Sequence, residues 1–266
     1  MSSAPPSVKV IVPRRGINDD NRGKKYALLR LAGAADTDYI WMMDDDIVPP
    51  AVTESGMGRL LQQLGCPDML ILPLKMNSGM GSLIERLQQT EYAAIQQLTI
   101  ESARRGRAVM CSGANLVVRR ERWLESYSDL HPELPSGDDM FLLQSFKRRG
   151  LRIAVADSEE LTAEVTPCPD VHSLLKQRMR WAGKSGHYTD RDIRLCGAAI
   201  VAANIMQVLC PPVILIKFPC EYALIKKRDN SASLFSAILL ELLYPLYMLL
   251  CLAGGLRRSR QSGTRF

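Results

Sequence analysis

The stretch YIWMMDDD, residues 39–46, joins five apolar residues to three consecutive aspartates. A short, continuous apolar run is typical of a strand that is buried on both faces of a sheet. In an open α/β sheet, ligands gather at the carboxyl ends of such strands. Three neighbouring carboxylates repel one another, and a divalent cation with oxygen ligands would offset that repulsion. The alternative is a helix N-cap cluster, because Asp is favoured at caps and in first turns.

Strand-like and helix-like segments alternate through the first half of the chain. This alternation predicts an α/β fold in which a mostly parallel sheet is flanked by helices. The expected strands are residues 8–12, 39–43, 69–74, 108–111, 116–118 and 152–156. The expected helices are residues 24–35, 54–64, 82–105, 139–149 and 171–182.

The C-terminal part of the chain is strongly apolar. Residues 196–216 carry no charge, and residues 232–256 carry only Glu241. Both runs are long enough to cross a bilayer core of roughly 30 Å, and Glu241 should then face protein or water rather than lipid. We therefore expect an α/β domain over residues 1–190 and a multi-pass membrane anchor over residues 191–266. The alternative is a pair of buried helices in a soluble protein.

The charge pattern supports a membrane partner rather than a nucleic acid. The net charge is +6, and the basic residues that flank the apolar runs are Lys226, Lys227, Arg228, Arg257, Arg258, Arg260 and Arg265. Basic flanks of this kind are typical of membrane segments. Aromatic residues do not alternate with these charges, and no nucleic-acid-binding motif is present. The seven cysteines show no metal-ligand spacing, so we interpret them as reduced, mostly buried thiols of a cytosol-facing protein.

Two further clusters carry chemistry-bearing side chains. Asp138 and Asp139 follow Gly137 and open a predicted helix, where they could equally serve as a cap. The sequence QRMRW, residues 177–181, ends a basic helix. Its Arg180 could hold phosphate oxygens in a bidentate fork. The alternative is a solvated charged face with Trp181 packed inward.

Taken in order, the three clusters resemble the D-x-D, "ED" and Q-x-x-R-W motifs of family-2 glycosyltransferases. These are inverting, membrane-associated enzymes that include cellulose and hyaluronan synthases. Residues 21–28, NRGKKYAL, are similar to the family's N-x-G-K-x-x-A-L segment, and residues 111–115, CSGAN, to its C-x-G turn on the acceptor side. The likeness covers residues 8–184, and the apolar C-terminal pair resembles the family's membrane anchor.

The resemblance implies a GT-A fold and transfer of a sugar from a nucleotide-diphosphate donor to a hydroxyl group. The acceptor would be a lipid, a polysaccharide or another molecule at the cytosolic membrane face. Asp44 and Asp46 match the D-x-D aspartates and would hold Mg²⁺ or Mn²⁺ on the diphosphate. Asp139 matches the general base, and Asp138 would be its helix-opening neighbour that orients the acceptor.

The same resemblance implies roles for five other residues. Lys24 would add positive charge near the nucleotide, and Gly113 would lie in the acceptor-side turn. Gln177, Arg180 and Trp181 would close the site, with Arg180 on the diphosphate and Trp181 beside the acceptor sugar.

The likeness is incomplete at its N-terminal end. Members of the family normally have two strand–helix units before the N-x-G-K segment, where this sequence has residues 1–13. We therefore expect a reduced nucleotide pocket, an N-terminally truncated catalytic domain and poor transfer by this chain alone. Two other functions stay open: a non-catalytic, membrane-anchored relative, and a different metal-dependent enzyme acting on phosphate esters through the Asp triplet.

Overall fold

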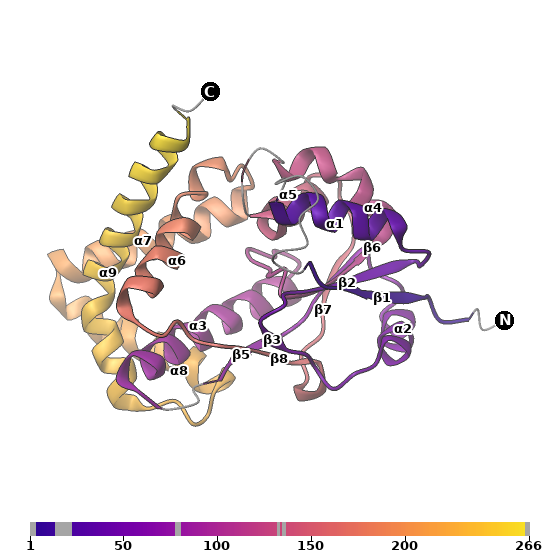
Figure 1. Ribbon diagram of the computed structural model, residues 1–266. Helices are drawn as coiled ribbons and strands as arrows, with labels where there is room; N and C mark the ends of the chain where they lie inside the picture. The colour runs from indigo at the N-terminus through magenta and orange to yellow at the C-terminus, as the bar shows by residue number, and fades with distance from the viewer. Residues whose placement is uncertain (1–3, 14–22, 78–80, 132–133, 135–136, 264–266) are drawn as a thin grey trace. The chain divides into compact units, whose positions relative to one another are not determined.

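The computed structural model describes residues 4–13, 23–77, 81–131, 134 and 137–263 (Figure 1). Most of the predicted polar loop before Lys24, including Asn21 and Arg22, lies outside the described residues, as does Arg265. The chain forms two compact units. Unit 1 comprises Met1–Leu74 and Thr99–Val165, and unit 2 comprises Lys75–Leu98 and Thr166–Phe266. This division differs from the boundary predicted after residue 190, because residues 166–190 group with the apolar helices that follow them.

Unit 1 contains a five-stranded sheet with the order β1-β2-β6-β4-β7. Its strands are β1 (Val8–Ile11), β2 (Tyr39–Met43), β6 (Asn115–Arg119), β4 (Met69–Ile71) and β7 (Ile153–Val155). The outer pairs β1–β2 and β4–β7 are parallel, but β6 runs antiparallel to both β2 and β4. The prediction of a mostly parallel sheet is therefore wrong. The pattern of alternating elements does not show which strands become neighbours, and β6 enters the sheet at the edge where β2 ends.

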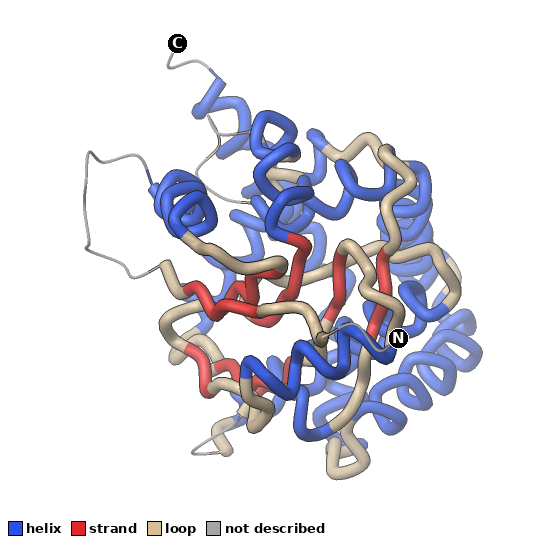
Figure 2. Tube along the Cα trace, turned by 90° about the vertical axis from the view of Figure 1, so that its right-hand side faces the viewer, coloured by secondary structure: helices blue, strands red, loops and turns tan. Residues whose placement is uncertain are grey.

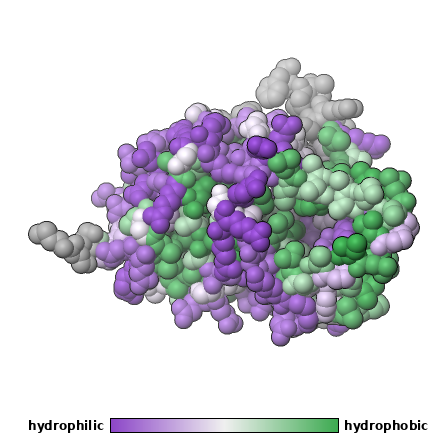
Figure 3. Space-filling model, turned by 180° about the vertical axis from the view of Figure 1, so that it is seen from behind, coloured by the Kyte–Doolittle hydropathy of each residue, from purple (hydrophilic) through white to green (hydrophobic). Residues whose placement is uncertain are grey.

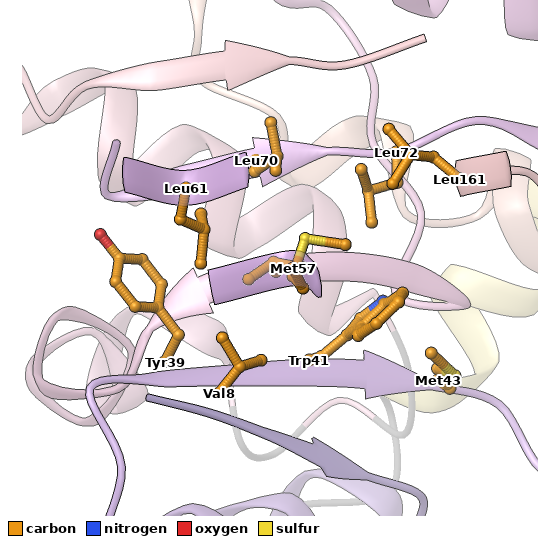
Figure 4. Packing of buried hydrophobic residues seen from close by; sticks show 10 residues of the cluster. Val8, Tyr39, Trp41, Met43, Met57, Leu61, Leu70, Leu72 and Leu161 are labelled. Carbon is orange, nitrogen blue, oxygen red and sulfur yellow. The ribbon is translucent and has the colours of Figure 1, made fainter. Parts of the chain in front are cut away.

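Helices cover both faces of this sheet. They are α1 (Gly23–Ala34), α2 (Glu54–Gln63), α4 (Arg120–Glu125) and α5 (Asp138–Arg148). Figure 1 shows α2 on one face and α1, α4 and α5 on the other, and Figure 2 shows the strands between the helices. Met57 and Leu61 of α2 pack against Tyr39 and Trp41 of β2 in a buried cluster (Figure 4). All five residues of β2 are buried, as predicted for a central strand.

Some short elements differ from the prediction. The expected strand over residues 69–74 is divided into β4 and β5 (Leu74–Met76), because Pro73 cannot donate a ladder hydrogen bond. Residues 108–111 do not form a strand. The short antiparallel pair β3 (Ile47–Val48) and β8 (Ala163–Val165) was not predicted, since runs of two or three residues carry no clear periodicity.

Unit 2 is helical apart from the end of β5. Its helices are α6 (Val171–Ala182), α7 (Arg191–Leu209), α8 (Ile214–Arg228), α9 (Leu234–Gly263) and the first part of α3 (Leu83–Arg104). The apolar helix expected over about residues 196–216 is shorter than predicted, because α7 ends at Leu209. Pro211 and Pro212 begin a short 3₁₀ turn before α8. Proline lacks the amide hydrogen that a continuing helix requires.

Two helices of unit 2 are long and apolar enough to cross a membrane by length and composition. They span Arg191–Leu209 and Leu234–Arg257. In the most apolar 18-residue segment of each helix, only 17% and 28%, respectively, is buried in the protein. These low values argue against the alternative of two buried soluble helices. Inside unit 2, Glu241 is buried and its carboxylate accepts a hydrogen bond from Lys217 Nζ at 2.7 Å. The expectation that Glu241 faces protein is confirmed.

All seven cysteines are free thiols. Only Cys111 and Cys251 are buried, so the expectation of mostly buried thiols is wrong. Cys210, which follows α7, and Cys220, in α8, are exposed.

Candidate active site

The aspartate triplet lies at the carboxyl end of β2. Asp44 follows the last strand residue directly, and Asp45 and Asp46 form a turn that leads into β3. The next helix, α2, is capped by Thr53, whose hydroxyl accepts a hydrogen bond from the Gly56 N–H at 3.2 Å. The triplet is therefore not a helix cap, and that alternative is wrong.

Asp44 is paired with Lys24, which lies in the first turn of α1. The Lys24 ammonium donates a hydrogen bond to Asp44 Oδ1 at 2.5 Å. Each side chain is about one-third exposed, so the pair lies at the surface of the sheet edge rather than in the core. The contact brings a positive charge to the carboxyl end of β2.

The pKa of Lys24 shows that it lies among several carboxylates. Desolvation by burial lowers its pKa, but the negative charge of Asp138 and that of Asp44 raise it. Asp139 raises it further, and the net result is a pKa above the ordinary value for lysine. Lys24 therefore stays charged and links the aspartate of β2 electrostatically to the acidic pair of α5.

Gly113 lies where these groups meet. Its backbone N–H donates a hydrogen bond to Asp139 Oδ2 at 3.2 Å, while Asp139 Oδ1 accepts one from the Met140 N–H at 2.8 Å. A Cβ atom placed on Gly113 would lie 3.7 Å from Asp138 Oδ2 and 3.9 Å from Lys24 Nζ. The small-residue turn thus touches both aspartates and approaches the lysine.

The acidic pair opens α5, and its two members differ in environment. Gly137 precedes the helix with φ 95°, a left-handed conformation that favours glycine. Asp138 is buried; desolvation raises the pKa of its carboxyl, and the charge of Lys24 partly opposes this rise. Asp139 is half-buried, and its side chain reaches another segment of the chain at Gly113. Both positions also suit the positive end of the helix dipole, but a capping role alone does not explain the contact with Gly113.

The antiparallel direction of β6 brings the Gly113 turn close to Asp138 and Asp139. Because β6 is antiparallel to β2, its first residue, Asn115, lies opposite Met43, the last residue of β2. The Asn115 side chain accepts a hydrogen bond from Trp41 Nε1 at 2.9 Å. It also donates to the carbonyl oxygens of Pro73 and Leu161, both at 2.9 Å. Sequence reasoning did not identify this buried amide, which fixes the start of β6.

Asp44 and Asp46 suit a divalent cation that is also bound by the phosphates of a substrate. Asp46 is exposed on the turn after Asp44. In the described part of the chain, no group of three or more His, Cys, Asp and Glu side chains is arranged to hold a metal ion. Mg²⁺ commonly uses only one or two protein carboxylates, with waters and substrate phosphates completing its shell. Asp44 and Asp46 fit that kind of site by donor chemistry, with Lys24 as a competing partner of Asp44.

The Q-x-x-R-W residues belong to unit 2 and lie in and at the end of α6. The helix begins after Asp170, whose carboxylate accepts a hydrogen bond from the Ser173 N–H at 2.7 Å. Arg180 is exposed, and the Trp181 side chain is 37% exposed. Arg180 therefore lies on a solvated face, whereas the protein covers Trp181 in part. The buried member of this segment is Arg178, which sequence reasoning did not single out.

Among solved structures, the chain is similar to the mannosyltransferase PcManGT from Pyrobaculum calidifontis, solved in complex with GDP-Man and Mn²⁺. The TM-score is 0.52 and the identity 14%, over 96% of this chain and 87% of that chain. This likeness shows the α/β GT-A fold. A mycobacterial protein is a weaker match, with a TM-score of 0.35 and 13% identity over 66% of this chain and 73% of that one. No curated protein sequence matches the chain.

The sequence also matches the model of a protein family described as glycosyltransferase like family 2. The matched region, residues 2–184, contains the aspartate triplet, the acidic pair and the Q-x-x-R-W segment. On this match, which covers well over half of its length, the chain belongs to glycosyltransferase family 2.

Proposed function

We propose that the chain transfers a sugar from a nucleotide-diphosphate donor to an acceptor hydroxyl, with inversion at the anomeric carbon. The observation that carries this proposal is the meeting of Lys24, Asp138 and Asp139 around Gly113, with Asp44 held by the Lys24 ammonium. This group places the Lys24 ammonium and three carboxylates near the carboxyl end of β2. Carboxylates can bind a divalent cation that neutralises a charged leaving group, and a carboxylate can also accept a proton. Membership of the glycosyltransferase family supports the same reaction class.

Asp139 is the proposed general base. The acceptor hydroxyl loses its proton to the Asp139 carboxylate while its oxygen forms a bond to the anomeric carbon. The bond from that carbon to the phosphate oxygen breaks in line, and the diphosphate leaves with the electron pair. The hydrogen bonds from Gly113 and Met140 fix the carboxylate, which must reach the hydroxyl within about 2.6–3.2 Å. Asp138, buried beside it, is proposed to orient the acceptor.

Asp44 and Asp46 are the proposed holders of Mg²⁺ or Mn²⁺ at the donor diphosphate. Bound there, the cation supplies positive charge that stabilises the leaving phosphate oxygen. The similar mannosyltransferase was solved with GDP-Man and Mn²⁺, which supports a nucleotide sugar and a divalent cation. Lys24 adds a second positive charge beside Asp44, and exchange of this partner upon donor binding would free the Asp44 carboxylate for the cation.

Gln177, Arg180 and Trp181 are proposed to close the site. The assignment rests on the Q-x-x-R-W motif. Arg180 would hold the diphosphate with its planar fork, and Trp181 would lie beside the acceptor sugar. The exposed positions of both side chains are compatible with ligand contact.

We further propose that α7 and α9 lie in a membrane, with the catalytic unit on its cytosolic side. Figure 3 shows hydrophobic side chains gathered on the helical surface of unit 2. The exposed apolar side chains of α7 and α9 include Leu195, Ile200, Met206, Leu209, Phe235, Leu242 and Leu246. Patches of this kind mark interfaces with membranes or other apolar partners. Membranes washed with alkaline carbonate should retain the chain, whereas release into the supernatant would contradict a spanning arrangement.

Donor binding and transfer by the purified full chain test the reaction. In detergent, calorimetry with GDP-mannose and other nucleotide sugars should detect binding of at least one donor in the presence of Mn²⁺. Asp44→Asn should weaken this binding about tenfold or more at fixed Mn²⁺, because a neutral amide is a poorer ligand for a hard cation. The product should carry the anomeric configuration opposite to that of the donor, as measured by NMR.

The exposed Asp36→Asn variant is the matched control for a lost carboxylate, and it should bind the donor as the wild type does. Failure of the wild type to bind any nucleotide sugar would favour a non-catalytic relative. Hydrolysis of the donor at a rate that does not depend on an acceptor would favour a phosphate-ester enzyme.

A further inference from the structure

Arg178 is the second residue of the QRMRW segment and is not one of the motif's fixed letters. Its side chain is 7% exposed, and it faces Glu91 of α3, which is 6% exposed. Arg178 Nη2 and Nε both donate hydrogen bonds to Glu91 Oε2, at 2.8 and 3.2 Å. The two charged groups therefore form a buried, hydrogen-bonded pair inside unit 2.

The same guanidinium touches two residues of the motif. Arg178 Nη1 donates a hydrogen bond to Gln177 Oε1 at 2.6 Å. Its central carbon lies 4.1 Å from the centroid of the Trp181 ring, which is the geometry of a cation–π contact. One planar group thus fixes an amide and an indole that lie four residues apart on α6.

Glu91 is itself held by a second helix. The Tyr247 hydroxyl of α9 donates a hydrogen bond to Glu91 Oε2 at 3.5 Å. Burial acts to lower the pKa of the Arg178 guanidinium, but the charge of Glu91 raises it above its ordinary value. Arg178 is therefore always charged, and its orientation is set by α3 and, through Glu91, by α9.

We propose that Arg178 is a positioning residue that orients Gln177 and Trp181 for the acceptor. This inference rests on the proposed function for its effect on turnover. Arg178 does not itself contact substrate in this scheme, and its action passes through the two side chains that it holds. Glu91 is the anchor that keeps the guanidinium in place.

Arg178 could stabilise the fold through its pair with Glu91, or it could also orient Gln177 and Trp181. Three variants separate these two roles. Arg178→Lys keeps the positive charge opposite Glu91 but lacks the planar fork that reaches Gln177 and stacks on Trp181. The double exchange of Glu91→Arg with Arg178→Glu restores a charge pair but removes the guanidinium from α6. Lys176→Gln, at an exposed position on the same helix, is the control for a changed basic residue.

Each variant of the full chain is compared in three measurements: thermal unfolding, Trp181 fluorescence, and kinetics with GDP-mannose and Mn²⁺ or whichever donor proves active. The Trp181 contribution is obtained by difference from the same variant carrying Trp181→Phe, because Trp41 and Trp123 also emit. We expect Arg178→Lys to shift Trp181 emission and to lower kcat about tenfold or more, while the donor Kd stays within about twofold. The double exchange should regain unfolding temperature relative to Glu91→Arg alone without regaining kcat.

Unchanged Trp181 emission in Arg178→Lys would overturn the proposal whatever the turnover. So would recovery of wild-type kcat by the double exchange, since that would show that only charge pairing matters. If the double-exchange variant does not fold, the Trp181 emission and kcat of Arg178→Lys are sufficient to test the proposal. If the wild type transfers no sugar, the proposed function fails, and the Trp181 emission still decides whether Arg178 holds the indole.

Discussion

Asp139→Asn is expected to lower kcat by about 10²–10⁴-fold, the usual contribution of a positioned general base. Asparagine has nearly the same shape, and its side-chain oxygen can still accept one of the two backbone hydrogen bonds, from the N–H of Gly113 or of Met140. Its NH2 group then faces the other N–H, so the local cost is one hydrogen bond, about 1 kcal/mol. The variant should therefore keep its fold and its donor affinity while losing the ability to take the acceptor proton. Steady-state kinetics and donor calorimetry on the same preparation measure the two effects separately.

The neighbouring Asp138→Asn variant sharpens this test. Asp138 is buried and its pKa is raised, so an uncharged amide should be tolerated with a smaller loss of turnover. Asp36→Asn, at an exposed position, should leave kcat unchanged. Wild-type turnover in Asp139→Asn would remove Asp139 from the role of base, and a larger loss in Asp138→Asn would assign that role to its neighbour.

Gly255→Ala is expected to destabilise unit 2 by about 1–3 kcal/mol, the range for an overpacked contact. A Cβ atom at Gly255 of α9 would lie 2.7 Å from the Gly183 nitrogen and 2.9 Å from both Ala182 Cβ and the Met179 carbonyl oxygen. These atoms belong to α6 and the residue after it, and none of them can move without moving the backbone. Thermal unfolding of the purified chain should shift downward by roughly 2–12 °C.

Two other glycines provide matched controls for this substitution. Gly197→Ala in α7 meets nothing within 4 Å, so it should be neutral or stabilise by about 0.5–1 kcal/mol through helix propensity. Gly254→Ala would press on Cγ, Sδ and Cε of the Met179 side chain, which can change its rotamer, and should cost less than Gly255→Ala. An unfolding temperature that is the same for Gly255→Ala and Gly197→Ala would contradict the close packing of α9 on α6.

The local features of the fold could be predicted from the sequence because each is encoded by neighbouring residues. The apolar run of residues 39–43 is β2, and α6 has the predicted limits Val171–Ala182. The three acidic and basic motifs were found because their residue types and order are distinctive. The family match over residues 2–184 confirms the membership that they implied.

Features that depend on distant partners could not be predicted. The direction of β6 follows from its pairing with β2 and β4, which no local pattern specifies. The contact between Asp139 and Gly113 and the burial of Arg178 against Glu91 join segments that are far apart along the chain. The break after Leu209 has a local cause instead, since Pro211 and Pro212 lack the amide hydrogen that a continuing helix requires.

The pairing of Met43 with Asn115 has a consequence for how the protein folds. The two residues are about seventy positions apart, so the chain between them must be closed into a loop before β6 can lie against β2. Such non-local contacts form slowly and late compared with the helices around them. The Gly113 turn directly precedes β6, so we expect pairing of the central strands to fix this turn beside Asp139, and the acceptor side of the site to be complete only when the sheet has closed.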